Sequence, residues 1–186
     1  MRQTGAKNDP HRAMRIAAAA LVCIETHGAA QTTHRRIAAV AGLPVGSLTY
    51  HFASLDEIIE AAFRYLATSV SSRLADTLDA AQTTEDARQA VVAFLSEDSP
   101  RKTRETILSI ELYSFAIRRP ALQSLMRDWM QASRTALEKH FSPAQARALD
   151  ALIEGVTLHN ATQPMLLPRD EIADIVTRLT TPGPCP

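Results

Sequence analysis

The chain has 186 residues, 46% of them hydrophobic, and its 20 lysine and arginine side chains are balanced by 20 acidic ones. This length can bury the core of one domain or of two small ones, and the absence of alternating Val, Ile, Thr and aromatic runs predicts an all-helical protein. Two cysteines and no apolar run of about 20 residues exclude a disulfide framework, a CxxC metal site and a membrane span, so we expect a cytoplasmic protein.

Charge is unevenly distributed along the chain. Residues 1–52 carry six lysines and arginines against two acidic residues, together with four of the six histidines, whereas the remainder is mildly acidic. A basic N-terminal segment suits contact with a polyanion. Arg2, Lys7 and Arg12 could form a basic arm that reaches DNA. Equally, they could be solvated charges in a disordered segment that makes no contact with DNA.

Helical patterns begin at Pro10. A first helix is predicted over 10–27, because apolar residues recur at helical spacing and Gly28 suits a left-handed stop. A second helix should start after the N-cap Thr33 and end at Gly42. The stretch 42–52, GLPVGSLTYHF, then holds a tight turn and a short third helix.

A long fourth helix is predicted from the N-cap Ser54 to about Ala81, and its polar far end suggests a connection between two halves. Further helices are predicted over the ranges 84–97, 102–118, 121–140, 143–162 and 169–180. The final TPGPCP cannot be helical.

Residues 33–52 have the pattern of a helix-turn-helix. Small alanines let two helices cross closely, Gly42 permits the turn, and Leu43, Leu48 and Phe52 anchor the short helix. Outer positions then carry Val45, Gly46, Ser47, Thr49, Tyr50 and His51.

The run from Thr32 to Phe63, TTHRRIAAVAGLPVGSLTYHFASLDEIIEAAF, resembles the DNA-binding domain of TetR-family transcriptional regulators. Beyond Phe63 only the helical layout and the length agree with that family. The positions that match the family pattern in order are Thr33, Ile37, Ala38, Ala41, Gly42, Gly46, Leu48, His51 and Phe52. Pro44, Thr49 and Leu55 depart from it, replacing a frequent capping serine, a frequent tyrosine and a usual lysine respectively.

The resemblance implies an all-α protein with a three-helix DNA-binding domain over 1–53, a connecting helix over about 54–81, and a ligand-binding and dimerisation domain over 82–186. It also implies the roles of DNA-facing residues. Thr33 would cap the second helix and contact phosphate beside Arg35 and Arg36, and Val45, Gly46, Ser47, Thr49, Tyr50 and His51 would line or flank the major groove. Arg35 and Arg36 could instead form a solvated face, and His51 could merely close the turn.

The second half is expected to hold a pocket for a small effector. Candidate ligand-binding residues are Glu111, Phe115, Trp129 and His159. Each has a structural alternative: Phe115 and Trp129 as core residues, Glu111 paired with Arg104 or Arg118, and His159 at a subunit interface. The predicted helices over 143–162 and 169–180 resemble the pair that forms this family's four-helix dimer interface.

The predicted function is therefore sequence-specific DNA binding, by a homodimeric repressor that a small molecule releases from a palindromic operator. A regulator controlled by a protein partner, or by no ligand, is the first alternative. An enzyme is the second, but the sequence has no HExxH, no GxSxG, no phosphate-binding glycine loop and no clustered metal ligands. We therefore expect no catalytic residue, no metal and no cofactor.

Overall fold

The computed structural model describes residues 10–162 and 165–181, and within these ranges it contains nine α-helices, one short 3-10 helix and no strand. The all-α prediction is confirmed. The predicted basic-arm residues Arg2 and Lys7 and the tail 182–186 lie outside the described residues.

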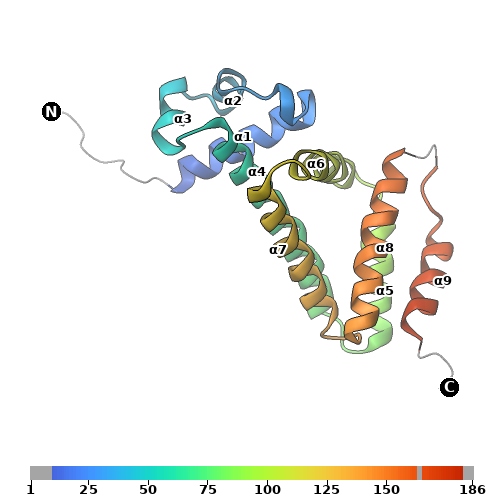
Figure 1. The fold of residues 1–186 in the computed structure, drawn as a ribbon. Helices are drawn as coiled ribbons and strands as arrows, with labels where there is room; N and C mark the ends of the chain where they lie inside the picture. The colour runs from blue at the N-terminus through green and yellow to red at the C-terminus, as the bar shows by residue number, and fades with distance from the viewer. Residues whose placement is uncertain (1–9, 163–164, 182–186) are drawn as a thin grey trace.

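Three short or medium helices form a group at one end of the long fourth helix (Figure 1). The first helix packs against α4, the second against the first, and the third against the second. The chain between the first two contains a single 3-10 turn that the sequence pattern did not indicate. Their bounds are α1 (Pro10–His27), η1 (Ala29–Gln31), α2 (His34–Ala41), α3 (Val45–His51) and α4 (Leu55–Asp79).

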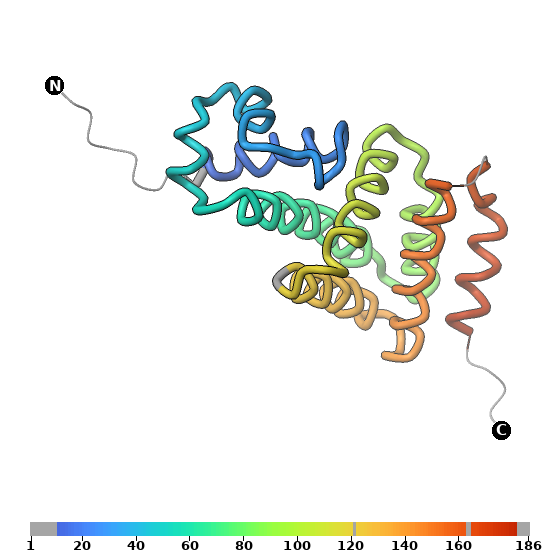
Figure 2. The backbone as a smooth tube through the Cα atoms, turned by 45° about the horizontal axis from the view of Figure 1, so that its top comes forward, coloured from blue at the N-terminus to red at the C-terminus, as the bar shows by residue number. Residues whose placement is uncertain are grey.

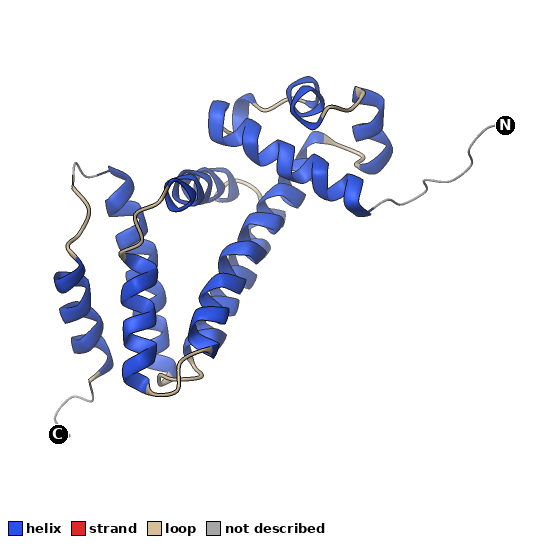
Figure 3. Cartoon of the chain, turned by 180° about the vertical axis from the view of Figure 1, so that it is seen from behind, coloured by secondary structure: helices blue, strands red, loops and turns tan. Residues whose placement is uncertain are grey.

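Five further helices build the second half. α7 lies along α4, α9 lies outside the paired α5 and α8, and α6 crosses between these two groups at the end nearest α1 (Figures 1 and 3). Their bounds are α5 (Thr84–Leu95), α6 (Pro100–Ala116), α7 (Pro120–Leu137), α8 (Pro143–Thr162) and α9 (Arg169–Thr180).

Local sequence signals explain where these helices start. The side chains of Ser54, Thr83 and Ser99 each accept a hydrogen bond from a backbone N–H in the first turn, as N-caps do. Pro100 and Pro120, which the sequence pattern places at the ends of preceding helices, are each the first residue of the next helix, where proline loses no hydrogen bond.

One hydrophobic core joins the N-terminal helices to α6 and α7. Ile37, Leu48, Phe63 and Leu112 of α6 are fully buried in it, and Leu125 of α7 is buried beside them. Burying a side chain of this size contributes about 1.5–3 kcal/mol, so contacts across this core hold α6 firmly against the first three helices.

A second core lies between the far half of α4 and the helices α5, α7, α8 and α9, and includes Leu78, Leu95, Leu137, Leu149 and Val176. α4 contributes side chains to both cores. It can do so because it extends from the N-terminal helices to the start of α5 (Figure 2). Because the first core contains residues from α1 to α7, it continues across residue 53 and marks no domain boundary there. The division into the domains 1–53 and 82–186 stays a prediction.

Candidate functional site

The turn between α2 and α3 has the geometry that its sequence predicts. Gly42 adopts the left-handed conformation with φ of 63°, and the backbone N–H of Leu43 donates to the carbonyl of Ala38 at 3.0 Å. Leu48 of α3 is fully buried beneath this turn. The short helix is therefore fixed by one buried anchor, and its opposite face is left exposed.

α3 begins without a side-chain cap. Pro44 stands at its N-cap with φ of −61°, and the backbone N–H of Ser47 donates to the Pro44 carbonyl at 2.9 Å. Proline's fixed φ, rather than a serine hydroxyl, therefore starts the helix.

The outer face of α3 carries four of the predicted DNA-binding residues. Val45, Gly46, Thr49 and Tyr50 are exposed, and 60% of the Tyr50 surface is accessible. The Thr49 hydroxyl donates to the Gly46 carbonyl at 3.2 Å, so its oxygen lone pairs and its methyl group remain available to a partner.

Ser47 and His51 are half-buried at the edges of this face. The ring of His51 lies edge-on to Tyr50, with ring centroids 5.3 Å apart. The pair stiffens the end of α3, since aromatic rings prefer this edge-to-face arrangement.

The start of α2 holds the remaining predicted DNA contacts. Thr33 caps the helix by accepting a hydrogen bond from the backbone N–H of Arg36 at 3.3 Å, as predicted. Arg35 and Arg36 are both exposed, and the Arg36 guanidinium also donates to the carbonyl of Gln31. On α1, Arg15 donates to the Ala41 carbonyl at 2.9 Å and so helps to close the far end of α2.

Leu55 shows why one departure from the family pattern is tolerated. It is half-buried and packs against the first core, so its side chain supports α4 where the family's usual lysine would face phosphate. Nearby, the Glu57 carboxylate accepts a hydrogen bond from the backbone N–H of Ala53 at 2.7 Å, which fixes the entry into α4.

A second candidate site lies in the other half of the chain, between α6, α7 and α8. It is a pocket with a volume of about 470 Å³, within the range of roughly 300–1,000 Å³ typical of small-molecule sites. Its lining residues are Ser109, Ile110 and Tyr113 from α6, Met130 and Arg134 from α7, and Asp150, Ala151, Glu154, Gly155, Thr157 and Leu158 from α8.

Polar groups cluster on the α8 wall of this pocket. Asp150 is buried and accepts a hydrogen bond from the Arg134 guanidinium at 2.9 Å. The Tyr113 hydroxyl donates to the Glu154 carboxylate. Burial raises the pKa of Glu154, Asp150 raises it further, and the Tyr113 hydrogen bond and Lys102 act against that rise.

A narrow cavity of about 40 Å³ adjoins the pocket and shares Ser109, Glu154 and Thr157 with it. Lys102 and Glu105 lie on its wall. Burial lowers the pKa of Lys102 and raises the pKa of Glu105. This cavity is too small for an effector.

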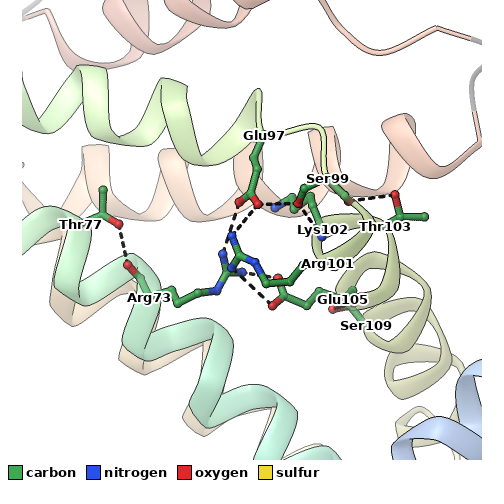
Figure 4. A network of polar contacts seen from close by, with 9 residues as sticks. All are labelled: Arg73, Thr77, Glu97, Ser99, Arg101, Lys102, Thr103, Glu105 and Ser109. Carbon is green, nitrogen blue, oxygen red and sulfur yellow. Dashed lines mark hydrogen bonds and ion pairs between the residues drawn. The ribbon is translucent and has the colours of Figure 1, made fainter.

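Glu105 also belongs to a charged network that joins α4, the segment after α5, and α6 (Figure 4). Arg73 of α4 reaches Glu97 after α5, at 3.4 Å, and Glu105 of α6, while Arg101 reaches Glu97 at 2.5 Å. The Arg73 Nε is buried without a hydrogen-bond partner. The network fixes the start of α6 against α4.

The four sequence-predicted ligand residues are not brought together. Glu111 faces the N-terminal helices, where its carboxylate accepts a hydrogen bond from the Ala29 amide at 2.9 Å. Arg104, one of its two predicted partners, instead pairs with Glu25 at 2.6 Å. Thus the structure places Glu111 outside the pocket wall.

The other three predicted ligand residues have different surroundings. Phe115 packs against the first core under the Arg119 guanidinium, which lies 3.5 Å from the ring centroid. Trp129 is buried in that core and lines the narrow cavity, and His159 is exposed on α8. Their ligand-binding roles remain predictions, and only Trp129 adjoins the pocket region.

Sequence reasoning missed the residues that give the pocket its polarity, above all Glu154, Tyr113 and the Arg134–Asp150 pair. Glu154 was detectable in part, because it is a lone acid within the small and apolar stretch ALIEGVTL. The partners of these groups come from other helices, which helical spacing alone does not reveal.

Neither a metal site nor a membrane span emerges from the part of the chain that the structure describes. No group of three His, Cys, Asp or Glu side chains there could hold a metal ion. Among the described helices none is long and apolar enough to cross a membrane.

Two family models match the chain. Residues 16–62 match the model of bacterial regulatory proteins of the tetR family, and residues 78–182 match the tetracyclin repressor-like C-terminal domain. The two matched segments contain α3 and the pocket respectively.

Individual proteins agree with these matches. The Streptomyces coelicolor A3(2) protein SCO7518 is 42% identical, with a TM-score of 0.86 over 93% of this chain and 100% of its own. The multidrug binding protein EbrR is 31% identical, with a TM-score of 0.76 over 95% and 98%. The HTH-type transcriptional regulator BetI 1 of Chromohalobacter salexigens is 28% identical over 83% of this chain and 81% of its own.

Proposed function

The chain belongs to the TetR family, which comprises DNA-binding transcriptional regulators and not enzymes, and on that basis we propose a ligand-released repressor that acts in the cytoplasm as a homodimer. Its proposed target is a palindromic operator, because two-fold symmetric dimers present two identical recognition helices to successive major grooves.

The exposed face of α3 supports the DNA-binding part of the proposal. It offers an apolar side chain, Val45, for a thymine methyl group, and hydroxyls on Thr49 and Tyr50 for base edges or backbone. No lysine or arginine belongs to α3, so charge for the phosphates comes from Arg35 and Arg36 of the preceding helix.

Dimerisation is proposed through α8 and α9. Along α8, Arg147 and His159 are exposed and do not line the pocket, whereas Leu149, Ile153 and Val156 are buried against the second core. Pairing this outer face with a second copy would form a four-helix arrangement. His159 is then an interface residue, which is the alternative that its exposure favours.

The pocket between α6, α7 and α8 carries the effector part of the proposal. Ser109, Ile110 and Tyr113 of α6 line it, and the same helix contacts the DNA-binding half through Glu111 to Ala29 and Arg104 to Glu25. A ligand that favours a different position of α6 would shift the population away from the DNA-binding arrangement. EbrR, a relative, has been solved with imidazole, ethidium, malachite green and proflavin.

Selection of bound DNA from a random pool, followed by release assays on the selected operator, tests this function. Enrichment of a palindrome, and its release by a compound that binds between α6, α7 and α8, would support a ligand-released repressor. Operator binding that no small molecule alters, but that a protein partner abolishes, would favour the alternative of a regulator without an effector.

A further inference from the structure

We infer that the pocket between α6, α7 and α8 selects an apolar effector that carries one cationic nitrogen, with Glu154 as its counter-ion. The inference rests on the proposed function, because it names the chemical class of effector for that same pocket. It is carried by the charges and contacts of the pocket wall.

Most of the wall suits an apolar body. Ile110, Met130, Ala151 and Leu158 line the pocket with hydrocarbon and thioether groups. Gly155 leaves additional space, since a Cβ added there would have no heavy atom within 4 Å beyond its own helix backbone and chain neighbours. Methionine adapts readily to ligands of irregular shape, so this part of the wall excludes water without demanding one outline.

The wall of the pocket has more acidic than basic side chains. Arg134 and Asp150 neutralise each other through a hydrogen bond of 2.9 Å. Glu154 is the remaining charged side chain among the residues that line the pocket, and its hydrogen-bond donor, Tyr113, is neutral. The pocket therefore carries a net negative charge whenever Glu154 is ionised.

Lys102 is the basic residue of the protein whose charge acts on Glu154, but it does not line this pocket. It lies on the wall of the narrow cavity, where its Nζ is 4.3 Å from the centroid of the Phe94 ring. Its charge is shared with Glu97 and Glu105 as well as Glu154.

The surroundings of Glu154 leave its charge incompletely compensated, because no unpaired basic side chain is among the residues that line the pocket. Burial and Asp150 raise its pKa, and this rise outweighs the opposing effects of Tyr113 and Lys102. A group whose charged form is left short of partners gains most from a cation supplied by a ligand. An anionic ligand would face repulsion from Glu154 at the same place.

The test compares three aromatic probes in calorimetric titrations of the full chain. Phenyltrimethylammonium and tert-butylbenzene have the same shape and differ by one charge, and benzenesulfonate supplies the opposite charge. We expect the cation to bind at least about tenfold more tightly than its neutral isostere, a difference of about 1.4 kcal/mol.

Three variants test whether the preference for the cation depends on Glu154 and whether the probes bind in this pocket. Glu154→Gln keeps the size of the side chain and an acceptor for Tyr113, so it should abolish the preference for the cation while leaving tert-butylbenzene binding unchanged. Gly155→Leu should block both probes, because the leucine fills open space in the wall. Glu138→Gln, at an exposed position after α7, is the matched control and should behave as the parent chain.

Equal binding of the two isosteres, a preference that persists in Glu154→Gln, tighter binding of benzenesulfonate, or no binding of the cation would each overturn the inference. Release assays separate this from the proposed function. A cation that binds through Glu154 without loosening the operator upholds the pocket chemistry and contradicts effector control. Release by an anionic or neutral compound bound in the pocket upholds effector control and overturns the cationic class.

Discussion

The Glu111 carboxylate accepts a hydrogen bond from the Ala29 amide at 2.9 Å, although 82 residues separate the two in the chain. Ala29 begins the 3-10 turn between α1 and α2, and Glu111 lies on α6, which also lines the pocket with Ser109, Ile110 and Tyr113. One helix therefore contacts both candidate sites. We regard this contact as the most direct link between pocket and DNA-binding helices.

Glu111→Ala should loosen that link. Loss of a hydrogen bond to a charged acceptor should lower the free energy of unfolding by about 1–3 kcal/mol and accelerate hydrogen exchange of the Ala29 amide. Glu111→Gln, which keeps an acceptor oxygen, should have a smaller effect, and Glu138→Ala at an exposed position should have almost none. Unchanged exchange at Ala29 in Glu111→Ala would show that the contact does not hold the turn.

Arg35 and Arg36 should differ in their effect on DNA binding. Arg35 is exposed, so Arg35→Ala should reduce the slope of log affinity against log salt concentration by about 1. The Arg36 guanidinium already donates to the Gln31 carbonyl, so Arg36→Ala should lower stability more and the salt slope less. Fluorescence anisotropy over a salt series, with thermal unfolding alongside, measures both. Equal slopes in both variants and the parent chain would identify the pair as a solvated face.

Thr49 should read a base through its methyl group or as a hydrogen-bond acceptor, because its hydroxyl proton is engaged with the Gly46 carbonyl. Thr49→Val keeps the methyl and removes the acceptor, whereas Thr49→Ser does the reverse. The variant that loses the contact used should lose about 1–3 kcal/mol of discrimination at one operator position. If a randomised operator library gives the same preference for the parent and both variants, Thr49 does not take part in readout.

Glu154 should reduce the stability of the free protein. Its pKa is raised in the folded state, so the folded protein binds this proton more readily than the unfolded chain does, and stability falls as pH rises through the folded pKa. Glu154→Gln should therefore be more stable than the parent at neutral pH, by on the order of 1 kcal/mol. The advantage should shrink on acidification, and thermal unfolding between about pH 5 and 8 measures it. An advantage that is constant with pH would exclude titration of Glu154 as its cause.

The sequence predicted helices well because their signals are local. Thr33 and Ser54 cap the helices that follow them, and Pro143 begins α8 as expected. The turn at Gly42 and the exposed face of α3 follow from spacing over 11 residues, 42–52, that also fit one family pattern.

The pocket could not be predicted equally well because its contacts are not local. Helical spacing shows that Glu111 and Glu154 each interrupt an apolar pattern, but it does not show which helix each side chain faces. Glu111 faces η1, and Glu154 faces Tyr113. The sequence thus singled out Glu111 on α6, which does not line the pocket, and missed Glu154 on α8, which does.

Selection of operators from a random DNA pool with the purified chain tests the central claim most directly. We expect enrichment of a palindrome whose half-site centres lie about one helical turn, or a multiple of it, apart. We also expect loss of that enrichment when the α3 face is altered by Tyr50→Ala together with Thr49→Ala. Recovery of no palindromic sequence, or the same enrichment from the doubly altered chain, would contradict it.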